Sequence, residues 1–144
     1  MVIDNLFVGQ TYHLKDLSNV TLIVQNISQD SCLLKIDVLI PEPSELRKGA
    51  EPIPDKGWIE LKTDSFNLGP NELAEVDITI SIPDDQRYRG KKYQFFIWSH
   101  MLPRPGIFSL VGLQSRIIFT TSERTYIPEL AFSGSSQPVG IELK

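Results

Sequence analysis

The chain has 144 residues, the length of one ordinary domain, and its 14 lysines and arginines against 18 aspartates and glutamates give a net charge of −4. This mildly acidic balance argues against a protein that coats nucleic acid. One cysteine and two histidines exclude an internal disulfide and a structural zinc site with the usual four ligands.

Short apolar runs separated by ten prolines and nine glycines indicate an all-β chain. Three strands are predicted first, a weak one at Leu6–Leu14 and stronger ones at residues 20–26 and 34–40. A short polar turn, Asn26–Ser31, separates the stronger two, so we expect them to pair as a hairpin. Asn26 suits this turn because its side chain can bond nearby backbone groups.

The segment Glu42–Lys56 is rich in proline and charge, and we predict that it is a long surface connection between two strands. Within it, residues 43–49 predict one short helical turn that Ser44 caps and Gly49 ends. No other window has a convincing helical period.

The remaining strands are predicted in the second half of the chain. They lie at Trp58–Lys62, around Phe66, and at Val76–Ile82, Lys92–His100 and Leu113–Thr121. Residues 76–82 alternate between apolar and polar without an error until Pro83, which has no N–H to donate to a sheet. We expect the last two strands to pair, and Gly90 to take a positive φ before the first of them.

Seven or eight strands at this spacing predict an all-β antiparallel sandwich in a single domain, residues 1–121. Residues 122–144 are predicted to be a tail. In it, Val139–Leu143 alternates like one additional strand, which can add to a sheet edge of its own domain or of a neighbouring molecule.

Three segments, Leu22–Ser28, Phe66–Glu72 and Ile78–Asp84, together resemble the layout of immunoglobulin-like sandwiches. The broad type is PapD-like and major-sperm-protein-like, similar also to the immunoglobulin-like modules of bacterial cell-surface proteins. The resemblance implies a structural tyrosine at a strand corner, where Tyr88 stands. The paired cysteines of antibody domains are missing, and no arginine and lysine pair fits the anchoring cleft of pilus chaperones, so a chaperone role does not carry over.

Catalysis has little support in the sequence, since His13, His100 and Cys32 are the only side chains that titrate near neutrality or offer a strong nucleophile. Cys32 opens an apolar run and is interpreted as a core residue, with a thiol enzyme using Cys32 and His100 as a remote alternative. The adjacent Asp84 and Asp85 lack the spacing of a calcium loop. We predict no catalytic residue, no metal site and no cofactor.

Aromatic side chains occupy both faces of the strand Lys92–His100. If Tyr93, Phe95 and Ile97 point inward, Phe96 and Trp98 point outward, and an outward apolar pair of this size requires a cover. Either a partner covers the pair, or the apolar loop Met101–Val111 and the tail, through Phe132 and Ile141, fold back over it. The candidate interface residues are therefore Phe96, Trp98, Met101, Leu102, Ile107, Phe108 and Ile141.

Basic residues concentrate in one turn, at Arg87, Arg89, Lys91 and Lys92. Because Tyr88 and Tyr93 alternate with them, these residues could bind single-stranded nucleic acid or an anionic polymer. The acidic Asp84 and Asp85 alongside and the negative net charge favour a solvated turn or the basic rim of an interface instead.

The leading functional hypothesis is a non-catalytic protein-interaction or structural assembly module, such as a subunit of a bacterial surface or filament-like assembly, with a protein partner or self-association. The alternative is a carbohydrate-binding module that offers the flat faces of Trp58, Trp98 and Tyr88 to sugar rings. No run approaches the ~20 apolar residues of a membrane span. Asp4 and the missing basic region argue against a signal peptide, which leaves open a cytoplasmic protein or an extracellular one whose leader has been removed.

Overall fold

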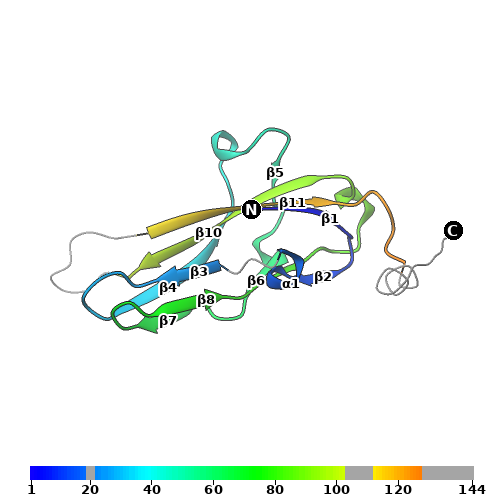
Figure 1. The fold of residues 1–144 in the computed structure, drawn as a ribbon. Coiled ribbons are helices and arrows are strands. Elements are labelled where there is room, and N and C mark those ends of the chain that lie inside the picture. Colours follow the sequence, from blue (N-terminus) through cyan, green and yellow to red (C-terminus); the bar gives the residue numbers. More distant parts are fainter. Residues whose placement is uncertain (19–21, 103–111, 128–144) are drawn as a thin grey trace.

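A computed structural model describes residues 1–18, 22–102 and 112–127, in which β-sheets pack face to face in two layers (Figure 1). The strands are β1 (Val2–Leu6), β2 (Thr11–His13), β3 (Leu22–Gln25), β4 (Cys32–Leu39), β5 (Glu51–Pro52), β6 (Ile59–Leu61), β7 (Ser65–Leu68), β8 (Leu73–Val76), β9 (Ile78–Ser81), β10 (Lys92–Met101) and β11 (Gly112–Thr121). The predicted all-β sandwich is confirmed. The described residues form eleven strands rather than seven or eight. The predicted strands at residues 6–14 and 76–82 each correspond to two strands, and β5 lies within the predicted Glu42–Lys56 connection.

The first sheet has the order β1-β11-β10-β4-β7, with the short β5 also paired to β10. Its centre is the predicted pairing of the last two strands, an antiparallel ladder that runs from Lys92 opposite Thr120 to His100 opposite Gly112. Two of its pairings are parallel, β1 with β11 and β5 with β10, where the sequence predicted antiparallel pairing throughout.

The second layer consists of two smaller sheets, the three-stranded β2-β9-β6 and the two-stranded β3-β8. Only Asp77 separates β8 from β9, so the two are halves of the predicted strand at residues 76–82. The predicted alternation is confirmed, since Val76, Ile78, Ile80 and Ile82 are all buried.

The predicted hairpin between residues 20–26 and 34–40 is wrong. Strand β3 pairs with β8, whereas β4 pairs with β10 and β7 in the other sheet. Both strands carry an apolar face, and placing them in opposite sheets lets Val24 and Ile36 enter the core from the two sides.

Asn26 lies in the turn that leads from β3 to β4, and its side chain bonds backbone groups of this turn as predicted. It also bonds a second turn of the chain. Its Nδ2 donates to the carbonyl oxygens of Asp30, Leu68 and Gly69, and its Oδ1 accepts from the backbone N–H and the hydroxyl of Ser28. The side chain thus joins the turn after β3 to the turn after β7.

The predicted strand at Leu6–Leu14 is displaced. Strand β1 ends at Leu6, a turn with Gly9 at φ +81° follows, and β2 covers only Thr11–His13. A single helical turn, α1 (Leu14–Ser18), comes next, and its five residues are too few to show a helical period in the sequence.

The Glu42–Lys56 connection contains the predicted helical turn as a 3-10 helix, η1 (Pro43–Glu45), and Gly49 has the expected positive φ, +80°. The cap is Glu42 rather than Ser44, because the Glu42 and Glu45 side chains each bond the other's backbone N–H. The connection then lies on β10, where the Gln94 side chain accepts from the Arg47 N–H and donates to the Glu45 carbonyl oxygen.

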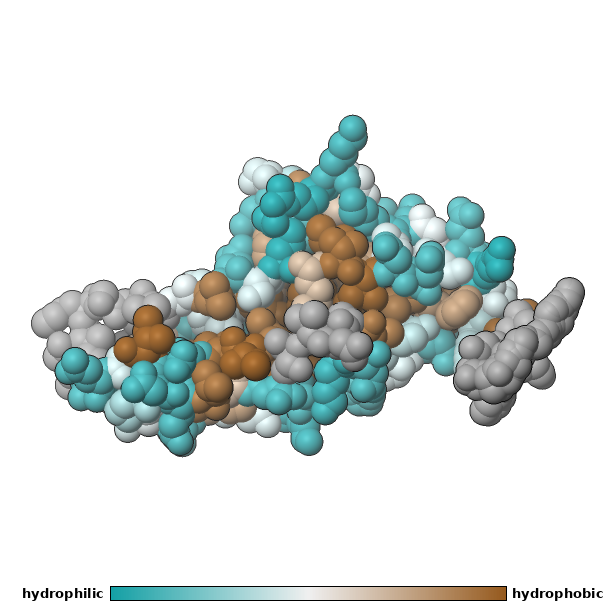
Figure 2. Space-filling view, in the orientation of Figure 1, coloured by the Kyte–Doolittle hydropathy of each residue, from teal (hydrophilic) through white to brown (hydrophobic). Residues whose placement is uncertain are grey.

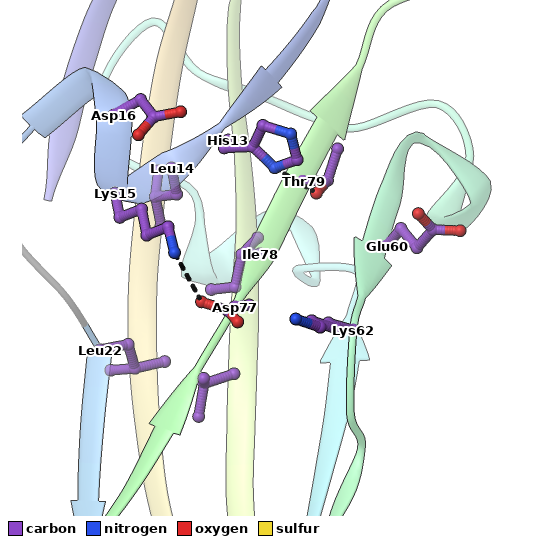
Figure 3. A pocket seen from close by; sticks show the side chains of 11 residues that line it. His13, Leu14, Lys15, Asp16, Leu22, Glu60, Lys62, Asp77, Ile78 and Thr79 are labelled. Carbon is purple, nitrogen blue, oxygen red and sulfur yellow. Dashed lines mark hydrogen bonds and ion pairs between the residues drawn. The ribbon is translucent and has the colours of Figure 1, made fainter.

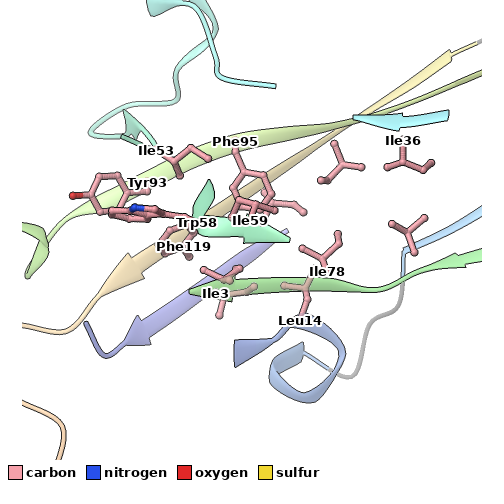
Figure 4. Packing of buried hydrophobic residues seen from close by; sticks show 14 of the residues in the cluster. Ile3, Leu14, Ile36, Ile53, Trp58, Ile59, Ile78, Tyr93, Phe95 and Phe119 are labelled. Carbon is pink, nitrogen blue, oxygen red and sulfur yellow. The ribbon is translucent and has the colours of Figure 1, made fainter. Parts of the chain in front are cut away.

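Large rings gather at one end of the core, among them Trp58, Tyr93 and Phe119 (Figure 4). Together with Tyr88, which contacts Trp58, they form what we call the aromatic end. The Trp58 ring meets the rings of Tyr88 and Tyr93 edge-on, at centroid distances of 4.8 and 5.3 Å. Two 3-10 helices close this end, η2 (Lys56–Trp58) and η3 (Gln86–Tyr88). The Tyr88 ring thus packs against Trp58 at this end. The predicted positive φ of Gly90 is confirmed, at +63°.

Candidate functional site

Strand β11 is covered at one end and uncovered at the other. Three of its side chains face the same side of the sheet, and their exposed fractions are 0% for Phe119, 2% for Ile117 and 52% for Leu113. The core face of β11 therefore emerges from the protein at Leu113. A leucine on a core face that remains half-exposed marks a position that no element of the described residues covers.

The edge of β11 that faces away from β10 loses its partner strand in the same region, near Leu113. Strand β1 pairs with β11 only from Ile118 onward, and the Ile118 N–H donates to the Met1 carbonyl oxygen at 2.9 Å. Alternate residues of an antiparallel strand direct their N–H and C=O groups the same way. Those of Gln114 and Gly112 thus face away from β10 as Ile118 does, and no described strand pairs with them.

A groove of about 340 Å³ lies between this free edge and β3, the edge strand of the other sheet. It is lined by Ile23, Val24, Gln25, Ile27, Ser28, Leu34, Ser99, Met101, Gly112 and Leu113. We call it the open groove. Hydrophobic surface appears over β3 and toward the start of β11 (Figure 2), and Ile23 and Ile27 are 52% and 78% exposed.

One polar atom in the open groove is unusual. Ser99 is 2% exposed, and its hydroxyl has no hydrogen-bond partner among the described residues. A buried hydroxyl without a partner costs free energy, so a polar group that reached it would be favoured.

Trp98 stands beside the groove on the opposite face of the sheet. Its ring stacks on His100 at a centroid distance of 5.5 Å, and His100 Nε2 lies 2.8 Å from Asp37 Oδ2. The indole also lies over Gly112, where an added Cβ would come within 2.1 Å of it. Gly112 is therefore needed for Trp98 to pack across the start of β11.

The predicted interface residues separate into three groups. Phe96 faces outward with Trp98, as expected, but it is only 4% exposed, and the Arg116 guanidinium sits 5.9 Å from its ring centre. Met101 lines the open groove, and the Leu102 N–H donates to the Leu33 carbonyl oxygen. Ile107, Phe108 and Ile141, together with Phe132 of the predicted cover, lie outside the described residues.

The predicted basic rim is Arg87, Arg89, Lys91 and Lys92. Arg87 pairs with Asp85 at 2.8 Å, and this hydrogen-bonded guanidinium lowers the pKa of the Asp85 carboxyl. Lys91 lies 3.6 Å from Glu51, Lys92 donates to a carbonyl of the Glu42–Lys56 connection, and Arg89 is half-buried. The neutralising contacts favour a solvated turn over an anion-binding surface.

The thiol-enzyme alternative is contradicted by the register of β4 and β10. Met101 lies opposite Leu34 and His100 opposite Lys35, so the His100 side chain shares the outer face with Lys35. Cys32 is 4% exposed and shares the core face with Leu34. The two side chains are on opposite faces of the sheet. Asp85 caps η3, and the described residues contain no group of three or more side chains that could hold a metal.

The aromatic residues of the carbohydrate alternative do not form one exposed face. Trp58 is 5% exposed, and its ring packs against Tyr88 at the aromatic end. Trp98 belongs to the other end of β10. The prediction that Trp58 offers a flat face to a sugar ring is wrong, because the ring is buried in the core against Tyr88 and Tyr93.

A second pocket, of about 350 Å³, lies on the outer side of β2, β9 and β6 (Figure 3). His13 Nδ1 and Thr79 Oγ1 are 3.2 Å apart in it, and Lys15 Nζ lies 3.9 Å from Asp77 Oδ1. The Lys15 and Asp77 side chains are 55% and 34% exposed, so solvent screens this pair. The pocket offers polar surface without a buried titratable group.

Sequence reasoning placed Met101 near the site but missed Ile23, Ile27 and Leu113. Ile27 could have indicated the groove, because it is an isoleucine inside an otherwise polar turn. The sequence around Leu113 contains no such indication, because the exposure of Leu113 depends on where β1 stops along β11.

No family model and no curated protein matches this sequence. Among solved structures, the ASH or PapD-like domain 7 of human CEP192 superposes with a TM-score of 0.60 at 14% identity, over 86% of this chain and 81% of that one. The periplasmic chaperone SfaE gives 0.55 at 13% identity, over 92% of this chain. The CsuC-CsuE chaperone and tip adhesion subunit pre-assembly complex of Acinetobacter baumannii gives 0.55 at 10%, over 94% of this chain.

The chain therefore has the immunoglobulin-like β-sandwich fold of PapD-like domains, as its sequence resemblance implied. It spans 61% of the SfaE chain and 56% of the matched chain from the Csu complex. In the described residues, no helix is long and apolar enough to cross a membrane.

Proposed function

We propose that this domain is a non-catalytic protein-interaction module that binds an extended segment of a protein partner along the free edge of β11, over the open groove. The observation that carries the proposal is a coincidence of two features. The stretch of β11 whose edge away from β10 has no described partner strand, Gly112–Ser115, is also the stretch whose core face is exposed at Leu113.

The chemistry of the groove suits a β-strand better than a small molecule. Addition of a strand satisfies the outward N–H and C=O groups of Gln114, and alternate side chains of that strand then enter the groove. The lining residues that such side chains would meet are mainly aliphatic, among them Ile23 and Leu113. Trp98, Met101 and Leu102, which the sequence singled out, border the same end of β10 and are proposed to flank the bound segment.

The structural neighbours support an interaction role. One of them is a complex of a chaperone with a tip adhesion subunit, and another is a periplasmic chaperone. Both contain a chaperone, a protein that acts on other proteins, and both share the fold of this chain. An assembly role for this domain follows if its partner is another subunit of the same structure.

The proposal is tested with fluorescently labelled peptides that alternate valine and threonine, and with matched peptides that carry a central proline. We expect the alternating peptides to raise fluorescence anisotropy and to protect the Gln114 amide from hydrogen exchange, because proline cannot complete the added ladder. Leu113→Asp should weaken binding, whereas Ile127→Asp, an exposed residue outside the groove, should leave it unchanged. Failure of every alternating peptide to protect Gln114 would overturn the proposal.

A further inference from the structure

The open groove has the dimensions and polarity of a short strand with one apolar face. Its edge on β11 is four residues long, Gly112–Ser115, and the opposing strand β3 also has four residues. Mainly apolar side chains line the groove, while the outer face of β11 beside it carries Gln114 and Arg116. A complementary strand therefore needs about four or five residues with alternate apolar positions.

One segment of this chain has that pattern and is not used by the described fold. Val139, Ile141 and Leu143 alternate with Gly140 and Glu142. With the three aliphatic side chains in the groove, Glu142 would project on the outer face of the sheet.

Charge on that outer face matches the segment. Arg116 follows the free stretch of β11 and lies on the outer face, over the Phe96 ring. Its Nε is buried and has no hydrogen-bond partner among the described residues. A carboxylate at the position of Glu142 would supply an acceptor for this guanidinium, which a purely apolar segment could not.

The length of the connection favours a segment from another molecule. Strand β11 ends at Thr121, about 30 Å from Gly112 at the usual rise per residue of a strand. Tyr126 packs near Phe7, with ring centres 5.6 Å apart, so the chain is still at the far end there. Eleven residues, 128–138, span at most about 40 Å when fully extended, so a return of about 20–30 Å along β11 to the groove of the same domain would use half to three quarters of that reach and would hold the connection extended at a cost in chain entropy.

We propose that the open groove binds residues 139–143 of a second copy of this chain, which adds to β11 as a further strand. The proposal rests on the proposed function and names its partner. The segment 139–143 and the open groove are different surfaces of the protein, so the contact between copies is heterologous. Such contacts repeat from copy to copy and produce either an open polymer or a closed ring.

Mixing of two full-length variants tests the proposal. Leu113→Asp disables the groove and Ile141→Asp disables the segment, while Ile127→Asp is the matched control. In sedimentation velocity, we expect the wild type and Ile127→Asp to self-associate and each of the other two to be monomeric alone. An equal mixture of Leu113→Asp and Ile141→Asp should form a dimer and stop there, because it contains one intact groove and one intact segment per pair.

A labelled peptide of residues 137–144 provides a second measurement that does not depend on assembly. It should bind the Ile141→Asp protein at least about tenfold more tightly than the Leu113→Asp protein, a difference of about 1.4 kcal/mol. An Arg116→Glu protein should prefer a peptide with Glu142→Lys over the natural peptide.

Several results would overturn the proposal and leave the proposed function standing. One is a monomeric wild type whose Gln114 amide is protected and becomes unprotected in Ile141→Asp, which would show that the segment binds its own domain. Another is a groove that binds alternating valine and threonine peptides but not residues 137–144. Absence of binding to both kinds of peptide would reject the groove as a strand-binding site altogether.

Discussion

The two ends of this sandwich are built from different side chains and reach different degrees of closure. At the aromatic end, Trp58 and Tyr93 are 5% and 3% exposed, and two 3-10 helices cover the rings. At the open groove, Ile23 and Leu113 are each 52% exposed. A single strand, β11, runs through both ends, so the difference arises from what covers the strand and not from the strand itself.

This contrast separates stability from interaction. A large aromatic ring contributes most to the free energy of folding when it is completely buried. Half-exposed aliphatic side chains add little to the stability of the isolated domain, but they gain burial when another chain arrives. Mutations at the two ends should therefore affect different measurements.

The largest expected effect is at the aromatic end. Trp58→Ala removes the ring that contacts both Tyr88 and Tyr93, and we expect a loss of about 3–5 kcal/mol in the free energy of unfolding, because a large cavity remains. Urea denaturation followed by circular dichroism measures it. Trp98→Ala is the control, and an equal loss in both variants would contradict the contrast.

The next largest effect is expected at Asn26, which is 3% exposed. Asn26→Ala leaves the carbonyl oxygens of Leu68 and Gly69 without this donor, so we expect a loss of about 2–3 kcal/mol. Asn26→Asp keeps the acceptor for Ser28 and loses the donor, which should recover only part of the loss. Recovery to wild-type stability would show that the donated bonds contribute little.

A pH effect is expected at Tyr93. Burial, together with the negative charge of Glu51, raises the pKa of Tyr93 from 10.0 to about 12. The folded protein holds this proton more tightly than the unfolded chain, so the stabilisation is complete below pH 10 and is lost as the pH rises to 12. The melting temperature should fall across that window, and less steeply in Tyr93→Phe. Tyr12, whose pKa burial also raises, should account for a remaining slope.

The smallest effect on stability is expected at the open groove. Ile23→Ser and Leu113→Ser replace half-exposed side chains, and each should change the free energy of unfolding by no more than about 0.5 kcal/mol. The same variants should lose peptide binding or self-association. A loss of several kcal/mol in either variant would show that the groove is part of the folding core.

Much of the fold could be predicted from the sequence because its signals are local. The alternation of residues 76–82 and the pairing of Lys92–His100 with Leu113–Thr121 depend on side-chain periodicity and are confirmed. The pairing of β3 and β4 was predicted wrongly, since a short turn also serves a crossing between sheets, and only the packing of Val24 against the other sheet decides between the two.

The candidate site was less accessible to sequence reasoning. Phe96 has the character of an interface residue in the sequence, yet it is buried in the folded domain, with the Arg116 guanidinium over its ring. Leu113 has the character of a core residue, yet it is exposed because β1 stops short of it. Both outcomes depend on contacts between segments far apart in the chain, which no local pattern records.

The chain has two tryptophans, and each end of the sandwich contains one of them. Trp58 is enclosed among tyrosine rings, whereas Trp98 stacks on His100 and lies over Gly112 at the margin of the groove. Intrinsic fluorescence can therefore observe the two ends separately once either indole is replaced by phenylalanine. Emission from Trp58 would follow unfolding, and emission from Trp98 would follow occupancy of the groove in the intact protein, without an attached dye.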